Sequence, residues 1–170
     1  VKILDINNHF YPNGKADMNW TQGERTRYNF ANVDETMLND YFEEFLLEYI
    51  EEFKPDIVGL GAIFSGAFKS LRIIAKKIKE TSPNIQIIIG GITSAMFAKD
   101  ILRKYNYIDY ACVGEGEETL LEFVKCFEYN SPVNHIGGFA YRDQGEIKRN
   151  EKTEYIQDLD ELPMPDYNLL

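Results

Sequence analysis

The stretch IIIGGITSAMFAKDILRKYNYIDYACVGEGEETL, residues 87–120, decides the fold. It contains two short apolar runs, Ile87–Ile89 and Tyr110–Val113, and each run leads into glycines that are followed by a segment of helical periodicity. Buried apolar strands that alternate with helices are typical of a parallel α/β sheet. Such sheets bind ligands outside the carboxyl ends of their strands, which is where these glycines fall. The stretch therefore predicts a binding edge together with a fold.

The same alternation continues on both sides of this stretch. We expect strands at residues 1–6, 56–60, 85–89 and 109–113, and helices at residues 37–53, 67–80, 94–105 and 117–127. Residues 11–33 hold little apolar periodicity and are interpreted as a long loop. Residues 138–150 alternate around Asp143-Gln144-Gly145, which indicates a β-hairpin. The order of elements predicts a doubly wound parallel α/β sheet with a carboxyl-terminal hairpin and an extended linker.

Apolar periodicity also predicts which face each helix buries. The first helix is expected to bury Leu38, Tyr41, Phe42, Phe45, Tyr49 and Phe53. The helix after Gly91 is expected to be capped by Ser94 and to bury Phe97, Ile101, Leu102 and Tyr105. The last helix is expected to bury Leu120, Val124 and Phe127.

Composition excludes several classes of function. The 170 residues carry a formal net charge of −10, the wrong sign for binding a phosphate backbone, so we expect no nucleic-acid partner. No apolar run is long enough to span a membrane and no signal peptide is visible, so we expect a cytoplasmic protein without a membrane partner. Cys112 and Cys126 cannot supply four thiolates for a structural zinc or an iron–sulfur cluster. With only His9 and His135 present, a histidine-based catalytic site is not expected.

The glycine edge is where chemistry is expected. Residues 59–66, 90–94 and 114–117 are predicted to converge there. Glycine lets the backbone approach a ligand closely, and a helix start offers free N–H groups to a phosphate. The spacing is neither GxGxxG nor a Walker loop. The pattern thus favours a nucleotide-like ligand without naming it, and tight turning alone is the other interpretation.

Five segments, in this order and spacing, resemble a known family. They are FKPDIVGL (53–60), FS (64–65), IIIGGI (87–92), IDYACVGEGEETL (108–120) and DLDELPMPD (158–166). Together they resemble the N-terminal cobalamin-binding domain of cobalamin-dependent radical SAM enzymes, and the match is best over residues 53–170. The resemblance implies a flavodoxin-like, Rossmann-like sheet that holds cobalamin along its carboxyl edge. The cofactor-binding residues that it implies are Gly61, Phe64, Ser65, Gly90, Gly91, Ile92, Thr93, Gly114, Glu115, Gly116 and Glu117.

Several positions depart from relatives that bind cobalt through a histidine. Many members of the family have Gly-Gly-x-His where this chain has Thr93, the DxHxxG motif is missing, and Gly61 stands in the place of a serine. The resemblance therefore implies cobalt held without a protein histidine, with His9 as the alternative ligand. A second hypothesis is a degenerate domain that has lost cobalamin and serves as a docking module, its edge plugged by Phe64, Ile92 and Met96. A third is a flavodoxin-type mononucleotide domain.

The resemblance also implies a domain organisation. Residues 1–130 would form the cobalamin-binding-like domain, residues 131–157 a hairpin extension, and residues 158–170 a linker to a radical SAM domain. S-adenosylmethionine and a [4Fe-4S] cluster would bind to that domain, whose CxxxCxxC loop is absent from this sequence. The parent is expected to be a methyltransferase or a cyclase-like enzyme, whereas the fragment alone would not be catalytic. Val1–Ile6 would take the place of the family's first strand, or alternatively its second.

Overall fold

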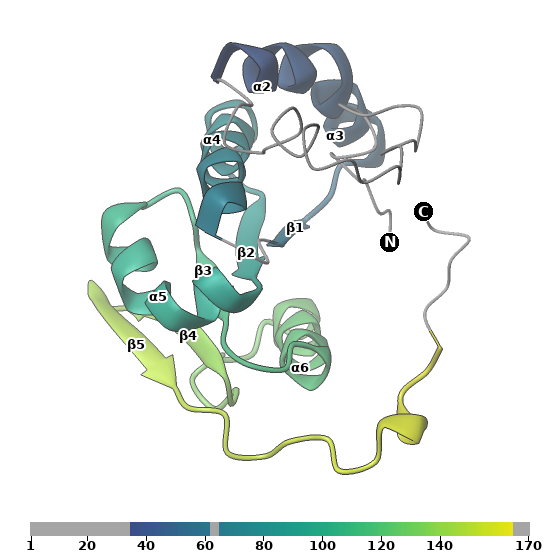
Figure 1. Ribbon diagram of the computed structural model, residues 1–170, viewed down its shortest axis with the longest axis vertical. Helices are drawn as coiled ribbons and strands as arrows, with labels where there is room; N and C mark the ends of the chain where they lie inside the picture. Colours follow the sequence, from purple (N-terminus) through teal and green to yellow (C-terminus); the bar gives the residue numbers. More distant parts are fainter. Residues whose placement is uncertain (1–34, 62–64, 165–170) are drawn as a thin grey trace, which may run out of the picture. The chain divides into compact units, whose positions relative to one another are not determined.

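The computed structural model describes residues 35–61 and 65–164 (Figure 1). These residues belong to two units, residues 35–155 and residues 156–164, which are treated separately. The expectations for the strand at 1–6, for the loop at 11–33, and for His9 and Phe64 lie outside the described residues.

One five-stranded sheet, in the order β1-β2-β3-β4-β5, forms the centre of residues 35–155. The strands are β1 (Ile57–Gly61), β2 (Gln86–Gly90), β3 (Tyr110–Cys112), β4 (Phe139–Asp143) and β5 (Glu146–Asn150). The first three strands are parallel, and β4 joins β3 in antiparallel pairing. The predicted α/β fold is confirmed, and the hairpin strands extend the parallel sheet into a mixed one.

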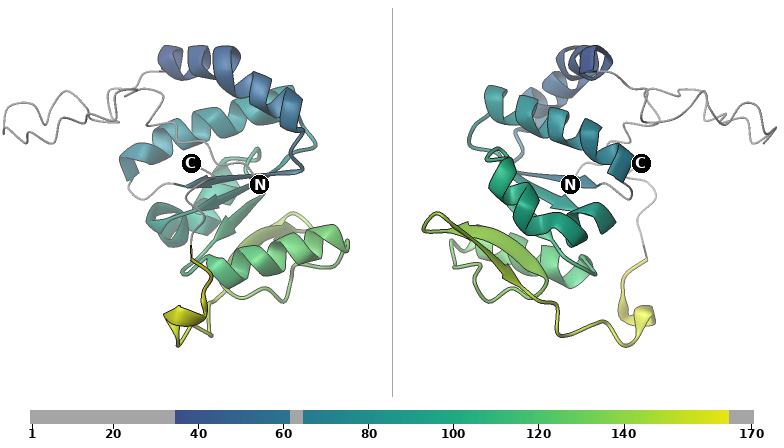
Figure 2. Two further views of the ribbon diagram at one scale, coloured as in Figure 1. Left: turned by 90° about the vertical axis from the view of Figure 1, so that its right-hand side faces the viewer. Right: turned by 60° about the vertical axis from the view of Figure 1, so that its left-hand side comes forward.

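Helices cover both faces of this sheet (Figure 2). Helices α4 (Ser65–Thr81) and α5 (Ile92–Lys104) follow β1 and β2, and the ring of Phe68 on α4 lies 5.9 Å from that of Tyr105 at the end of α5. Helix α6 (Glu117–Glu128) covers the opposite face, where Phe123 and Cys126 pack with Ile88 of β2. Because neighbouring residues of a strand point to opposite faces, Ile87 and Ile89 point toward α4 and α5.

The first helix contains a π-helical segment that sequence periodicity did not predict. It runs through α2 (Glu35–Tyr41), η2 (Phe42–Leu46) and α3 (Leu47–Phe53), and its α2 portion packs against α4. Its buried side chains are Leu38, Phe42, Leu46 and Ile50. The expected burial of Phe45, Tyr49 and Phe53 was wrong, because the wider π turns keep residues four apart on one face.

Helix α5 begins two residues earlier than expected. Its N-cap is Gly91, and the Ser94 hydroxyl donates to the Gly90 carbonyl over 3.0 Å, so the capping role predicted for Ser94 was wrong. Ile101 and Leu102 are buried as predicted. Phe97 is 49% exposed, because its non-helical φ of −118° kinks the helix and turns this side chain away from the core.

The buried face of α6 also differs from the prediction. Leu120, Val124 and Phe127 are each at least 41% exposed, whereas Thr119, Phe123 and Cys126 face the sheet. Hydropathy ranks threonine and cysteine below leucine, so the buried face that it predicts for α6 lies one residue later than the observed face. Thr119 is buried without penalty because its hydroxyl donates to the Gly137 carbonyl over 2.9 Å.

The hairpin confirms its prediction in detail. Gln144 and Gly145 join β4 to β5 with φ of 48° and 85°, and two successive positive φ values are the mark of a type I′ turn. In residues 156–164 the only helical element described is η3 (Leu159–Glu161), where the Asp158 carboxylate accepts from the Asp160 N–H over 3.0 Å. No helix within residues 35–61 and 65–164 is both long and apolar enough to cross a membrane.

Candidate cofactor-binding edge

The parallel strands bring the predicted glycines to one edge. Gly61 and Gly90, the last residues of β1 and β2, are direct partners in the ladder. Gly114 follows β3 by two residues, at the same carboxyl end of the sheet. Ser65 begins α4 beyond β1, so segments from all three predicted loops start from this edge. The topology therefore gathers the described glycines as the sequence predicted.

This edge is open above its backbone. Within the part of the chain that the structure describes, a Cβ built on Gly61, Gly90 or Gly116 would meet no atom within 4 Å. Gly91 has a φ of 92°, a backbone conformation that residues other than glycine rarely adopt. Among the described residues, no side chain therefore blocks the approach of a ligand to the main chain at Gly61 and Gly90.

The start of α5 adds an apolar flank to the edge. Ile92 and Met96 are 64% and 67% exposed, although both are large apolar side chains. Thr93 lies between them with its side chain buried, so of the two predicted residues only Ile92 is presented to solvent. Exposed apolar side chains beside bare backbone are typical of a surface that another group covers.

The loop Gly114–Glu117 lies at the other side of the edge. Gly114 has a φ of 85°, and Gly116 is the N-cap of α6 without any side-chain capping bond. Glu117 and Glu118 occupy the first turn of the helix, where its positive end stabilises carboxylates. The loop therefore joins a glycine of positive φ to two carboxylates in the first turn of α6.

Sequence reasoning missed a packed cluster beneath this loop. Lys152, two residues after β5, has a side chain that is only 7% exposed, and its Nζ lies 3.3 Å from Glu118 Oε2. Gly138 lies so close to Val113 that a Cβ there would be 2.5 Å from the Val113 carbonyl oxygen. The Gly137-Gly138 doublet is a sequence signal that could have indicated close packing here. No local sequence pattern distinguishes Lys152 from a surface lysine.

Cys112, at the end of β3, supplies no reactive group to the edge. Burial raises the pKa of its thiol to about 11, and the positive charge of Lys152 opposes that rise only in part. The thiol is therefore neutral near pH 7, and a neutral thiol is a poor nucleophile and metal ligand. Across the described part of the chain, no three His, Cys, Asp or Glu side chains are grouped to hold a metal ion.

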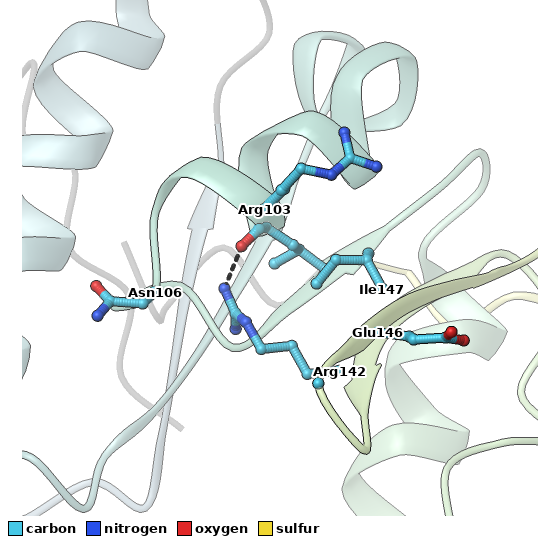
Figure 3. A pocket seen from close by; sticks show the side chains of 7 residues that line it. Arg103, Asn106, Arg142, Glu146 and Ile147 are labelled. Carbon is cyan, nitrogen blue, oxygen red and sulfur yellow. Dashed lines mark hydrogen bonds between the residues drawn. The ribbon is translucent and has the colours of Figure 1, made fainter.

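A cavity of about 430 Å³ lies at the opposite, amino edge of the sheet (Figure 3). Its lining residues are Leu102, Arg103, Asn106, Arg142, Gly145, Glu146 and Ile147. The Arg142 guanidinium donates to the carbonyls of Leu102, Tyr105 and Ile108, so both of its terminal nitrogens are engaged with backbone. We assign this cavity a structural role, because its central cation supports backbone.

Known proteins resemble this chain over most of its length. The family model described as "B12 binding domain" matches residues 21–124. An uncharacterized methyltransferase of Pyrococcus horikoshii is 30% identical over 125 residues, which are 74% of this chain and 27% of that protein. The anaerobic magnesium-protoporphyrin IX monomethyl ester cyclase of Rubrivivax gelatinosus is 31% identical over 140 residues, 80% of this chain and 25% of the enzyme. The chain thus spans about a quarter of the length of these relatives.

Solved structures show the same fold. The cobalamin-dependent S-adenosylmethionine radical enzyme OxsB, with aqua-cobalamin and S-adenosylmethionine bound, superimposes with a TM-score of 0.54 at 22% identity. That likeness covers 74% of this chain and 16% of OxsB. The radical S-adenosylmethionine methyltransferase TsrM of Kitasatospora setae gives a TM-score of 0.53 at 19% identity, over 71% of this chain and 22% of TsrM.

Proposed function

The chain belongs to the B12-binding domain family, as its sequence predicts, and we propose that it binds cobalamin along the carboxyl edge of its sheet. The observation that carries this proposal is the open backbone at Gly61, Gly90 and Gly116, where an added Cβ would have no atom of the described residues within 4 Å. The proposal includes the predicted cofactor-binding residues along this edge.

The chemistry of the edge fits this cofactor. Cobalamin carries its metal inside the corrin ring, so it needs close backbone approach and apolar contact more than a cluster of protein ligands. Gly90 and Gly91 would allow the nucleotide tail to pass, and Ile92 and Met96 offer apolar contact beside it. When bound, cobalamin supplies a cobalt centre that can carry a methyl group or take part in one-electron chemistry.

The degenerate docking module predicts a different edge. In that hypothesis Phe64, Ile92 and Met96 would fill the space above the glycines. Ile92 and Met96 are instead mostly exposed, while Phe64 lies outside the described residues. A flavodoxin-type mononucleotide domain gains no support from the named relatives, whose names describe methyltransferases and a cyclase. Cobalamin binding is therefore the better-supported function.

We further propose that the parent protein continues into a radical SAM domain through residues 158–170. The chain's share of about a quarter of its relatives supports this proposal. That domain would bind S-adenosylmethionine and the [4Fe-4S] cluster, and the parent would act as a methyltransferase or cyclase-like enzyme in the cytoplasm. The fragment alone would bind the cofactor without catalysing the reaction. A CxxxCxxC sequence in the continuation of the parent chain would test this assignment directly.

Cobalamin binding can be measured on the 170-residue chain. We expect the chain to retain hydroxocobalamin through gel filtration and to shift its visible absorption spectrum. Gly90→Val should leave the free energy of unfolding nearly unchanged, because its side chain enters open space, but should weaken binding at least about tenfold by blocking backbone approach. Gly59→Ala is the control, since a Cβ there meets only Ile88 within the sheet at 3.9 Å. Absence of retained corrinoid in the unmodified chain would refute the proposal.

A further inference from the structure

Lys152 is a nearly buried cation beside the proposed cofactor edge. Its side chain is 7% exposed, whereas most lysine side chains extend into water. It follows β5 by two residues, so it reaches the edge from a part of the chain far from the glycine loops. A charge in such a position requires a specific reason for its burial.

The hydrocarbon stem of Lys152 packs where two glycines leave room for it. An ideal Cβ on Gly114 would lie 3.7 Å from Lys152 Cβ, and one on Gly138 would lie 3.1 Å from Lys152 Cδ. The N–H of Val113 donates to the Gly138 carbonyl over 2.7 Å, which joins the two glycine segments. The stem therefore lies across the backbone that leads into the Gly114–Glu117 loop.

The ammonium group reaches the first turn of α6. Its Nζ lies 3.3 Å from Glu118 Oε2 and 3.5 Å from Thr119 Oγ1. The Thr119 hydroxyl in turn donates to the Gly137 carbonyl over 2.9 Å and lies 3.4 Å from the Glu115 carbonyl. Lys152 thus offsets one of the two carboxylates of this turn and contacts the threonine that ties the loop to the segment before β4.

We propose that Lys152 is a positioning residue for the Gly114–Glu117 loop. Its stem holds the loop backbone in place, and its ammonium offsets the Glu118 carboxylate at an edge that receives a phosphate-bearing cofactor. Cobalamin contains a phosphodiester in its nucleotide tail, and an uncompensated carboxylate nearby would oppose its binding. The inference concerning cobalamin rests on the proposed function, whereas the inference concerning the loop does not.

The loop is tested first in the chain without cofactor. Lys152→Ala removes stem and charge, and we expect hydrogen exchange of the amides of residues 114–118 to accelerate roughly tenfold. Lys152→Met keeps an unbranched stem and should stay close to the unmodified chain. Lys148→Met is the matched control, because Lys148 lies on β5 and is more exposed. Unchanged exchange in Lys152→Ala, with circular dichroism that reports a folded chain, would overturn the positioning role.

The charge is tested by hydroxocobalamin affinity. We expect Lys152→Met to weaken binding about threefold, an effect of the size known for a single charge near a helix terminus. The double variant Lys152→Met/Glu118→Gln should restore the affinity, and the loss should shrink at high salt. A purely structural role of Lys152 would give no rescue by Glu118→Gln, so absence of rescue would overturn the electrostatic part.

The two readouts separate this inference from the proposed function. If the unmodified chain fails to bind hydroxocobalamin, the proposed function fails, and the exchange rates still decide whether Lys152 positions the loop. If the chain binds the cofactor but Lys152→Met binds equally well, cobalamin binding stands and the role of the Lys152 charge is refuted.

Discussion

The two edges of the parallel sheet are built in opposite ways. At the amino edge, charged side chains satisfy the backbone: the Asp109 carboxylate accepts from the Ile87 N–H over 2.7 Å and pairs with Lys79 over 2.8 Å. Arg142 donates to three carbonyls in the same region. At the carboxyl edge, Gly61 and Gly90 instead present bare backbone, with exposed apolar side chains close by.

This difference indicates that the sheet separates stability from binding. Buried polar networks rigidify a structure when every member finds a partner, as at the amino edge. An edge that binds a ligand must leave backbone groups exposed, so its rigidity has to come from the packing of the residues beneath it. At the carboxyl edge that support comes from the close packing of Gly138, Val113 and Lys152. Substitutions at the amino edge should therefore affect stability alone. At the carboxyl edge, substitutions of exposed residues should affect binding, whereas substitutions in the packed layer beneath them should affect stability.

The largest expected effect concerns Gly138, the deepest point of the carboxyl edge. Its φ is 66°, and in Gly138→Ala the added Cβ would lie 2.5 Å from the Val113 carbonyl oxygen. The Val113 carbonyl belongs to backbone that cannot yield easily, and the Lys152 stem lies 3.1 Å from the same Cβ, so we expect the free energy of unfolding to fall by more than about 3 kcal/mol. Urea denaturation monitored by circular dichroism measures this change.

Gly145→Ala provides the control for positive φ alone. Gly145 has a φ of 85°, but no atom would lie within 4 Å of its Cβ, so a loss of only about 1 kcal/mol is expected. Similar losses in the two variants would contradict the inference that close contact with Val113 excludes a side chain at position 138. They would also contradict the existence of a packed supporting layer under the carboxyl edge.

Arg142 tests the amino edge. Arg142→Met keeps much of the stem but leaves the carbonyls of Leu102, Tyr105 and Ile108 without this donor. We expect a loss of about 2–3 kcal/mol in unfolding free energy, with hydroxocobalamin affinity unchanged once the variant is folded. Arg103→Met is the matched control, since Arg103 lines the same cavity but is largely exposed and pairs with Asp100. Weakened cofactor binding in Arg142→Met would contradict the division between the two edges.

What the sequence predicted well is what local patterns encode. Apolar runs that end in Gly90-Gly91 and Gly114 locate both strand–helix units, and Gln144-Gly145 locates the hairpin turn. These features are predictable because they depend on local backbone conformation, which neighbouring residues determine. The buried stripe of α6 was displaced because Thr119 is buried through a hydrogen bond to Gly137, eighteen residues away. Lys152 could not be found at all, since its burial depends on contacts with Gly114, Glu118 and Gly138.

Apart from the controls, the smallest stability effect is expected at Cys112, which tests how far the open region of the carboxyl edge extends toward the end of β3. Burial raises the pKa of Cys112 from its ordinary value of 9.0 to about 11. The thiol therefore stabilises the fold fully below its unfolded pKa, and this stabilisation is lost as pH rises through the folded pKa. Between pH 8 and pH 11 the unmodified chain should lose about 2 kcal/mol more than Cys112→Ala, as measured by urea denaturation at each pH.

Cys126→Ala keeps Cys112 and should keep this loss, which makes it the control for removing a buried thiol. Lys152→Met should enlarge the loss slightly, because the nearby positive charge opposes the rise in the pKa of Cys112. Parallel stability curves for the unmodified chain and Cys112→Ala would mean that the thiol is hydrated. The open part of the edge would then extend inward past Gly114 to the end of β3, and the supporting layer would be thinner than the packing around Lys152 indicates.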